Sequence, residues 1–343
     1  MPGRVFLRGI EGERYDLGGE RQERLDAPRV IREAERGWRD EKAVGHEDSS
    51  PQSRAKWMLG PGDDRFLTQT VQVHFVRIEA GGANGGHGHQ NEAAFYILQG
   101  RGYEVHDARR YEWSAGDLVV VHNDSRHQHH NASRDEPALA LVVKAKALWM
   151  FLGLTQQGKR GTIPEGREGA FGQRLDWARL WSPGVDSLRK VVHSGELAWE
   201  DTPDGRVKWL ARQGLDTRLF SLDIWLQAVA GGSSTRRHWH MADEVFYVLQ
   251  GTGHTLEWQV EAEITDHYAA RVAIEPRRFD WKAGELVYVA QNTVHQHVAD
   301  GGDVLLLSAR NRLFGLLGYE ATVHLDDAET GAPAATLDGP APV

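Results

Sequence analysis

The sequence predicts an all-β protein made of two tandem barrels of one small fold, each with a short helical lead-in. Three observations predict it: a residue pattern recurs along the chain, short apolar runs alternate with glycine- and asparagine-containing turns, and helical patterns are few. Short strands at such spacing are typical of antiparallel sandwiches and barrels. We expect two domains, residues 1–160 and 161–343, with cores at about 57–154 and 209–318.

The repeat is clearest around two pairs of segments. HGHQNEAAFYILQG, at His87 to Gly100, returns 151 residues later as HWHMADEVFYVLQG, at His238 to Gly251. The second pair, Ser114 to Asn131 and Lys282 to Ala299, is 168 residues apart. The second copy therefore carries 17 extra residues, which lie within Thr255 to Asp280. Two matched pairs in the same order indicate duplication of one folding unit.

Helix and linker signals are limited. The polar lead-in Pro28 to Arg39 is the best candidate for a helix. The glycine-rich, polar segment Gly158 to Gly169 is where the border between the domains is expected. Both copies close with a short apolar segment, at Leu148 to Leu154 and at Leu313 to Gly318.

Composition narrows the class of protein. Apolar residues make up 40% and charged residues 26%, as in a soluble globular protein. A net charge of -9 disfavours nucleic acid or an anionic membrane as partner. The start of the chain, Met1 to Arg8, lacks the pattern of a signal peptide, and no apolar run is long enough for a membrane span, so we expect a cytoplasmic protein. With no cysteine, any metal must be held by nitrogen and oxygen.

Paired histidines are the main functional signal. In a strand, residues i and i+2 face the same side, so His238 and His240 point together. Glu244 has the same parity, and His295 on a later strand could close the set. Three imidazoles and one carboxylate leave open positions on an octahedral iron, manganese or nickel ion.

The first copy differs at the acid. Ala93 stands where the second copy has its glutamate, and Glu92 has the wrong parity for a regular strand. We expect a three-histidine site of His87, His89 and His127, unless a local bulge turns Glu92 inward. The alternative is a duplicated barrel that kept these residues but acts as a scaffold or binds a sugar or another ligand.

These residues resemble the cupin superfamily, whose fold is the double-stranded β-helix or jelly-roll barrel. Its first motif is His-x-His, three or four residues, Glu, six residues and Gly, and the second copy has the whole of it. Its second motif ends in a histidine and an asparagine. The matching positions are His238, His240, Glu244, Gly251, Gly284 and His295 in the second copy and His87, His89, Gly116, His127 and Asn131 in the first.

The layout is similar to gentisate dioxygenase and related ring-cleaving bicupins, which use iron(II) on three histidines of the N-terminal cupin. This resemblance implies oxidative cleavage of a hydroxylated aromatic acid, of the gentisate or salicylate type, with non-heme Fe(II) and O2; Mn(II) or Ni(II) are alternative metals. Oxalate decarboxylase-like bicupins, usually with manganese, keep four ligands in both halves. An Mn-dependent decarboxylase or another lyase, isomerase or hydrolase therefore stays open, as does a non-enzymatic small-ligand-binding cupin. The resemblance also implies a homo-oligomer.

Four further residues are catalytic candidates under this resemblance. Arg126 and Arg236 border the ligands and could bind a substrate carboxylate, although ordinary surface arginines are an equal interpretation. His129 and His297 share the inward parity of the ligand histidines. They could shuttle protons or orient a ligand, and buried structural histidine is the alternative.

Overall fold

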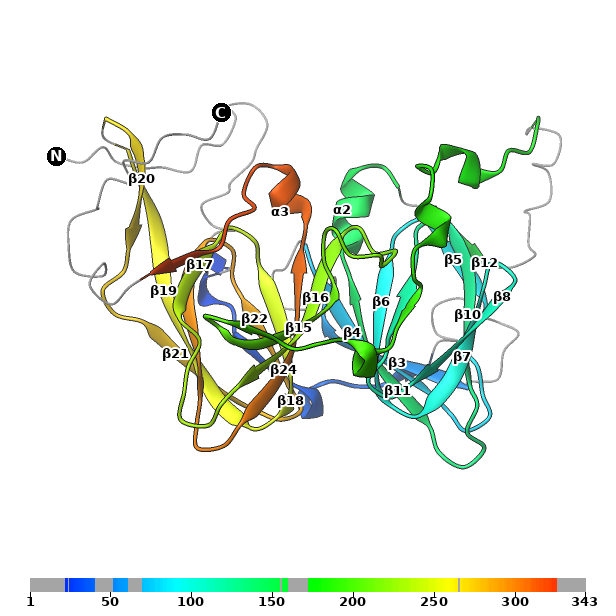
Figure 1. The fold of residues 1–343 in the computed structure, drawn as a ribbon, viewed down its shortest axis with the longest axis horizontal. Coiled ribbons are helices and arrows are strands. Elements are labelled where there is room, and N and C mark those ends of the chain that lie inside the picture. The colour runs from blue at the N-terminus through cyan, green and yellow to red at the C-terminus, as the bar shows by residue number, and fades with distance from the viewer. Residues whose placement is uncertain are drawn as a thin grey trace.

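The computed structural model describes residues 22–23, 25–40, 52–60, 70–154, 156–159, 172–264 and 266–325. Two β-barrels lie side by side (Figure 1), which confirms the all-β fold class. The first residues of the chain, 1–21, and most of the expected border between the domains, 160–171, lie outside the described residues. Among the described residues, no helix has the length and apolar character needed to cross a membrane.

The N-terminal barrel has two sheets. One has seven strands, in the order β13 (Val191–Val192), β9 (Leu118–Val121), β6 (Ala93–Gln99), β11 (Ala138–Lys144), β4 (Gln72–Ile78), β3 (Ser53–Leu59) and β2 (Arg39–Asp40). The other has five strands, in the order β12 (Gln157–Lys159), β5 (His87–His89), β10 (Ser125–Asn131), β7 (Arg101–His106) and β8 (Arg109–Ser114). Buried residues alternate with exposed ones along β7 and β10, as expected for a barrel wall.

The C-terminal barrel repeats this plan. Its seven-stranded sheet has the order β1 (Val30–Arg32), β22 (Glu285–Val289), β18 (Glu244–Gln250), β24 (Val304–Asn311), β16 (Leu222–Val229), β15 (Gly205–Ala211) and β14 (Glu200–Thr202). The second sheet has the order β20 (Tyr268–Val272), β19 (Thr252–Ile264), β23 (Thr293–Ala299), β17 (Arg237–His240) and β25 (Val323–Leu325), and β21 (Arg277–Lys282) also pairs with β19.

Helices are few and short. The two apolar closing segments form α2 (Lys146–Phe151) and α3 (Leu313–Leu316), which lie near each other at the top of Figure 1. The described residues also include four 3₁₀ turns: η1 (Glu33–Glu35), η4 (Trp177–Leu180), η5 (Val185–Ser187) and η6 (Ser194–Glu196).

The prediction of a helix at Pro28 to Arg39 is wrong. This segment contains strand β1 and the 3₁₀ turn η1, and its last residue begins β2. Val30 and Ile31 are β-branched and suit a strand, and Ile31 is fully buried against the C-terminal barrel. Tertiary pairing with β22 therefore decides the local conformation.

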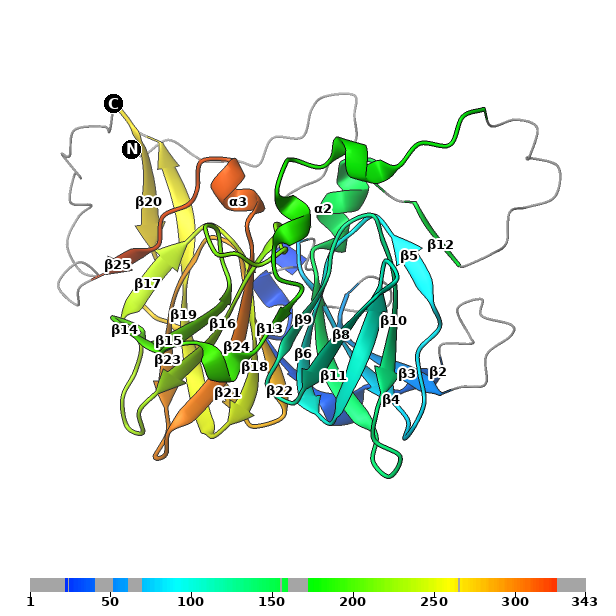
Figure 2. The ribbon, with the colours of Figure 1, turned by 45° about the vertical axis from the view of Figure 1, so that its right-hand side comes forward.

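Each barrel takes an edge strand from the other part of the chain. Strand β1 precedes the N-terminal barrel but pairs with β22 of the C-terminal one. Strand β13 follows the N-terminal barrel and pairs back with β9. One cluster of buried residues between the two seven-stranded sheets joins both barrels, and within it Phe75 and Tyr247 meet edge to face at 5.6 Å between ring centroids. Figure 2 shows the two barrels packed along this seam.

The 17 extra residues extend a hairpin. In the N-terminal barrel, β7 and β8 are joined by a two-residue turn, Asp107-Ala108, with φ of 46° and 68°. At the same place in the C-terminal barrel, β19 continues to Ile264 and returns as β20. The insertion therefore extends the second sheet past the barrel, as the β19–β20 hairpin in Figure 1 shows, and replaces this turn.

Candidate metal centres

Three histidines converge inside the C-terminal barrel. His238 and His240 lie on β17, and His295 lies opposite His238 on β23. One ligand atom of each lies within 4.8 Å of the others. All three side chains are buried. The alternation of side chains along a strand, which gives His238 and His240 a common face, brings this pair to His295.

The N-terminal barrel has the same arrangement. His87 and His89 lie on β5, and His127 on β10 is the register partner of His87. Their ligand atoms also lie within 4.8 Å of one another. The rings of His87 and His127 are 4.4 Å apart, close to the 4.1 Å between the equivalent rings of the other barrel.

Backbone carbonyls orient the paired rings in the same way in both barrels. The first ring of each pair bonds the carbonyl two residues before it, and the second ring bonds the carbonyl two residues after it. These bonds are His87 Nδ1 to Gly85 O at 2.8 Å, His89 Nδ1 to Asn91 O at 2.7 Å, His238 Nδ1 to Arg236 O at 2.8 Å and His240 Nδ1 to Ala242 O at 2.8 Å. A carbonyl only accepts, so Nδ1 carries the proton and Nε2 keeps its lone pair. Metal-ligating histidines are oriented by such bonds.

The ring nitrogens that do not bond these carbonyls are suited to binding a cation. Nε2 of His89, His240 and His295 is buried and has no hydrogen-bond partner in the described part of the chain. Burial lowers the pKa of His89 to about 2 and that of His240 to about 3, which keeps both rings neutral. Buried, unpartnered polar atoms are costly, and a bound ion would remove that cost. Imidazole donors with a carboxylate fit iron, manganese, nickel or zinc.

Of the two matched positions beside the histidine pairs, only the one in the C-terminal barrel holds a carboxylate. Glu244 begins β18, and its Oε2 lies 3.5 Å from His240 Nε2. Burial raises the pKa of Glu244 to about 7. Ala93 occupies the matched position and packs into the core of the N-terminal barrel. The two centres thus differ by one acid, as the sequence indicates.

Glu92 does not turn inward. Its buried carboxylate crosses to the other barrel, where it accepts hydrogen bonds from Ser221 N at 2.8 Å and Ser221 Oγ at 2.7 Å, and from Phe220 N at 3.0 Å. The matched residue of the second copy mirrors this contact, since Thr70 Oγ1 donates to Asp243. These two acids join the barrels and leave the N-terminal centre with three histidines.

His129 and His297 each lie two residues after the third ligand histidine, on β10 and β23. His129 Nδ1 is 3.7 Å from Glu104 Oε2, and its ring is 5.6 Å from that of His127. His297 Nδ1 is 3.0 Å from Thr255 Oγ1. Both side chains are buried, as their parity predicts. They border the ligand histidines without joining the triads.

The two candidate arginines lie on the outside. Arg126 is exposed and points away from the neighbouring His127, because adjacent residues of a strand face opposite sides. It lines a cavity of about 410 Å³ that also reaches His89 and Trp177. Arg236 is exposed as well, and its carbonyl orients His238.

Sequence reasoning missed two cations whose charges act on the histidine pairs. Arg310 is the register partner of Glu244, and its charge opposes the rise in the pKa of that acid. Lys144 ends β11 at the corresponding place in the other barrel, and its charge helps to lower the pKa of His89. Both follow the last apolar run of their copy, and that shared position is the signal that could have found them.

A cavity of about 240 Å³ connects these groups in the C-terminal barrel. Its lining includes His240, Arg310 and the aromatic residues Trp209 and Tyr319, next to α3. A metal bound at His240 would therefore be close to a space for a small molecule, with a guanidinium group in its wall.

Comparisons with known proteins agree with this architecture. Residues 74–144 match a family model described as the cupin domain, and residues 212–310 match one described as auxin binding protein. No curated protein matches the sequence of the chain.

Solved structures resemble most of the chain, across both barrels. Oxalate decarboxylase from Bacillus subtilis at pH 4.6 is 14% identical and has a TM-score of 0.58, over 90% of this chain and 81% of that one. Another structure of that enzyme, from work on its Mn(II) centres, is also 14% identical, with a TM-score of 0.59 over 96% of this chain and 89% of that one. At this identity the likeness concerns the fold. The chain therefore has the fold of a bicupin, and its residues 74–144 match the cupin-domain family.

Proposed function

We propose that this protein is a metal-dependent enzyme that acts on a small carboxylic acid, with a decarboxylase or related lyase reaction in its C-terminal barrel. The observation that carries the proposal is the grouping of three buried histidines, Glu244 and Arg310 beside a cavity of about 240 Å³. Mn(II) is the metal we favour, and the manganese enzyme among the structural neighbours supports that choice.

The size and charge of the cavity support a small anionic substrate. Its volume is below the usual range for drug-sized ligands, about 300–1,000 Å³. Arg310 donates to Thr322 Oγ1 at 3.2 Å and lies over the ring of Trp225, 5.7 Å from its centroid, and both contacts limit its rotamers. A guanidinium held in this way can bind a carboxylate in a fixed orientation.

The residues around the cavity would have different roles in the reaction. A divalent ion at His238, His240, His295 and Glu244 would supply Lewis acidity to a coordinated substrate oxygen and, if redox-active, an electron path to O2. Arg310 would orient a carboxylate and offset its charge. With a pKa of about 7, Glu244 would release a proton from its carboxyl group as the ion binds near neutral pH. The enclosed barrel would keep bulk water away.

A second candidate function belongs to the N-terminal barrel. There Ala93 leaves three histidines without a carboxylate, so an iron(II) ion would keep more positions for substrate and O2. The cavity of about 410 Å³ beside His89 has room for an aromatic acid. Arg126 lines it from the outer side of β10, so it could bind the carboxylate of an acid in this cavity but not of one coordinated inside the barrel. This arrangement supports the dioxygenase of the gentisate or salicylate type expected from the sequence, with His129 as a proton-transfer residue.

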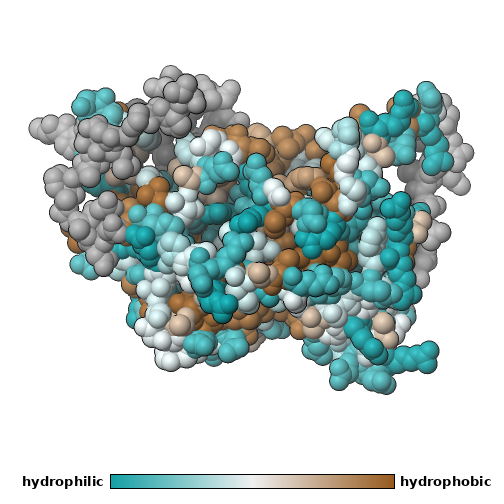
Figure 3. Space-filling view, viewed as in Figure 1, coloured by the Kyte–Doolittle hydropathy of each residue, from teal (hydrophilic) through white to brown (hydrophobic). Residues whose placement is uncertain are grey.

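Oligomerisation is part of the proposal. Large apolar side chains are exposed on and beside the two short helices, including Phe151 at 88% and Leu316 at 82%. Figure 3 shows hydrophobic surface at this place, over α2 and α3. Patches of this kind often mark contacts between subunits. We propose a cytoplasmic homo-oligomer in which this surface is covered.

Metal analysis combined with matched variants tests the function. The full-length protein is purified without oxygen, its metals are measured by mass spectrometry, and His238→Ala is compared with His87→Ala. Carbon dioxide release is measured with oxalate and other small di-acids, and oxygen uptake with a panel of hydroxybenzoates. We expect His238→Ala to lose carbon dioxide release and about one ion per chain, while His87→Ala keeps the activity.

The opposite pattern would move the chemistry to the other barrel. Oxygen uptake that is lost in His87→Ala and kept in His238→Ala would support the dioxygenase and overturn the proposed decarboxylase. A protein that gains no ion when iron or manganese is added would refute both enzyme functions.

A further inference from the structure

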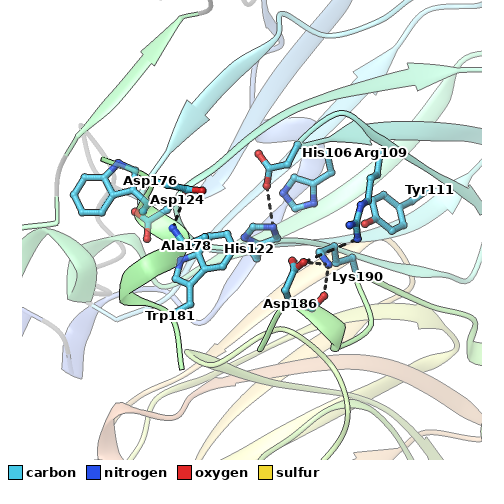
Figure 4. A pocket seen from close by; sticks show the side chains of 12 residues that line it. His106, Arg109, Tyr111, His122, Asp124, Asp176, Ala178, Trp181, Asp186 and Lys190 are labelled. Carbon is cyan, nitrogen blue, oxygen red and sulfur yellow. Dashed lines mark hydrogen bonds and ion pairs between the residues drawn. The ribbon is translucent and has the colours of Figure 1, made fainter. Parts of the chain in front are cut away.

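A third group of metal-ligating side chains lies in the wall of the N-terminal barrel, apart from the three-histidine centre. His106 ends β7, Asp107 follows in the tight turn, and His122 comes directly after β9. One ligand atom of each lies within 4.8 Å of the others. They line a cavity of about 330 Å³ (Figure 4), in which His106 and His122 stand side by side.

His106 has no internal partner that explains it. Its side chain is 1% exposed, and neither ring nitrogen has a hydrogen-bond partner in the described part of the chain. The nearest carboxylate oxygen on its strand, Glu104 Oε1, is 3.8 Å from Nδ1, too far for a hydrogen bond. A buried imidazole with two unused nitrogens is costly unless something binds it.

The contact between His122 and Asp107 needs a positive centre. His122 Nδ1 lies 2.7 Å from Asn123 O and must donate its proton there, because a carbonyl only accepts. In a neutral ring, Nε2 is then a lone pair, yet it faces Asp107 Oδ2 at 3.2 Å. Two acceptors at this distance repel each other, so either a second proton or a metal ion must lie between them.

The spacing suits a metal ion. Two ligand atoms bound to zinc at 2.0–2.1 Å with tetrahedral geometry are about 3.3 Å apart. The 3.2 Å between His122 Nε2 and Asp107 Oδ2 is close to that value. Asp107 is also held in place, because its Oδ1 accepts from Arg126 N at 3.0 Å.

The C-terminal barrel lacks this set, so it is not a general feature of the duplicated fold. Glu257 stands at the place of His106, and Ala290 at the place of His122. The long insertion replaces the turn that carries Asp107. Arg29 fills the corresponding space and binds Glu257 through two bonds of 2.9 Å.

The charge around the cavity favours a cation. Asp107, Asp124, Asp176 and Asp186 line it, against the two basic residues Arg109 and Lys190. Another His and Asp cluster in the described chain, around His254, has a guanidinium group from Arg278 among its acids instead. The His106 group has an open side, toward the cavity.

We propose that His106, Asp107 and His122 bind a divalent transition-metal ion, with Zn²⁺ as the best fit, and leave one coordination position open to the cavity. Three protein ligands and an open position are the arrangement in which zinc binds water or an anionic ligand. This site is independent of the function proposed above.

The test uses Zn²⁺ itself and a matched variant. His122→Ala places in the N-terminal barrel the residue that the C-terminal barrel carries at this position. Both cupin centres are first disabled by His87→Ala and His238→Ala, the protein is stripped with a chelator, and Zn²⁺ is titrated by calorimetry. We expect one ion per chain in this background, and an affinity at least about 100-fold lower after His122→Ala, since even residues around the ligands change metal affinity 10–100-fold.

Two further measurements test whether His122 is a ligand of the ion. In the otherwise native protein, His122→Ala should lower the zinc content by about one ion per chain while circular dichroism stays unchanged. Co²⁺ in the disabled background should give visible absorption bands that His122→Ala removes. If Zn²⁺ binds equally with and without His122, or not at all, the proposal is refuted. In that case the contact is an imidazolium–carboxylate pair, and NMR of the zinc-free protein would show two protons on the His122 ring.

Discussion

Glu92 gives the sharpest prediction, because its carboxylate links the two barrels. Truncation in Glu92→Ala would leave Ser221 N and Ser221 Oγ without their acceptor in a buried environment. Phe220 N loses its acceptor as well, but this residue is 45% exposed and water can replace the bond. Each buried donor left without its acceptor costs about 1–3 kcal/mol, so we expect the free energy of unfolding in urea to fall by about 2–6 kcal/mol for the two groups of Ser221.

A double-mutant cycle with Ser221→Ala separates this contact from general packing. Ser221→Ala alone should cost about 1 kcal/mol, and the two changes together should cost less than the sum of the single effects. Metal content should stay as in the native protein. If Glu92→Ala loses the ion of the N-terminal barrel while stability is unchanged, Glu92 is a ligand and the assignment to the interface is wrong.

Three further outcomes follow from buried groups elsewhere. Arg29→Ala leaves the charge of Glu257 buried and should lower the free energy of unfolding by about 3–5 kcal/mol; a loss under about 1 kcal/mol would contradict this. Burial lowers the pKa of His129 to about 3, so below pH 6.5 the unfolded chain takes up a proton that the folded chain does not. The metal-stripped protein should therefore lose stability between pH 7 and 5, by up to about 1.4 kcal/mol per pH unit for this residue, and His129→Gln should reduce the slope measured by urea unfolding. Gly253→Ala would push a methyl group into a backbone carbonyl and a tryptophan ring and should cost at least about 1–3 kcal/mol, whereas Gly37→Ala meets no atom within 4 Å and serves as the neutral control.

The paired histidines could be predicted because their geometry is local. The period of two along a strand gives His238 and His240 a common face whatever the rest of the chain does. The repeat then supplies His295, since a matched residue in a duplicated unit takes a matched position. The same reasoning indicates that Ala93 removes the acid from one barrel, and the structure has the alanine in the core at that place.

Contacts between the barrels could not be predicted in this way. Strand β1 pairs with β22, about 255 residues later in the chain, and no local pattern marks such a partner. The polar sequence around Val30 favours a helix by itself, and burial of Ile31 against the second barrel overrides that preference. The partner of Glu92 could not be predicted for the same reason. Parity indicates that Glu92 does not face the metal, but the serine that it binds lies 129 residues later in the chain.

Exchange of edge segments also explains why the two barrels differ in access. Arg29, just before β1, places its guanidinium over Phe279 and against Glu257, inside the wall of the C-terminal barrel. Lys190, just before β13, takes the matching place in the N-terminal barrel and lies over Tyr111.

The partner residue decides what each cation does. Glu257 neutralises Arg29 and closes that wall, whereas the N-terminal barrel has His106 at the matched position. Lys190 therefore turns to Asp186, where Nζ donates to the backbone oxygen at 3.0 Å, and the space beside His106 stays open as the cavity of about 330 Å³. The replacement of Glu257 by His106, together with that of Arg29 by Lys190, thus leaves a closed wall in one barrel and an open cavity in the other.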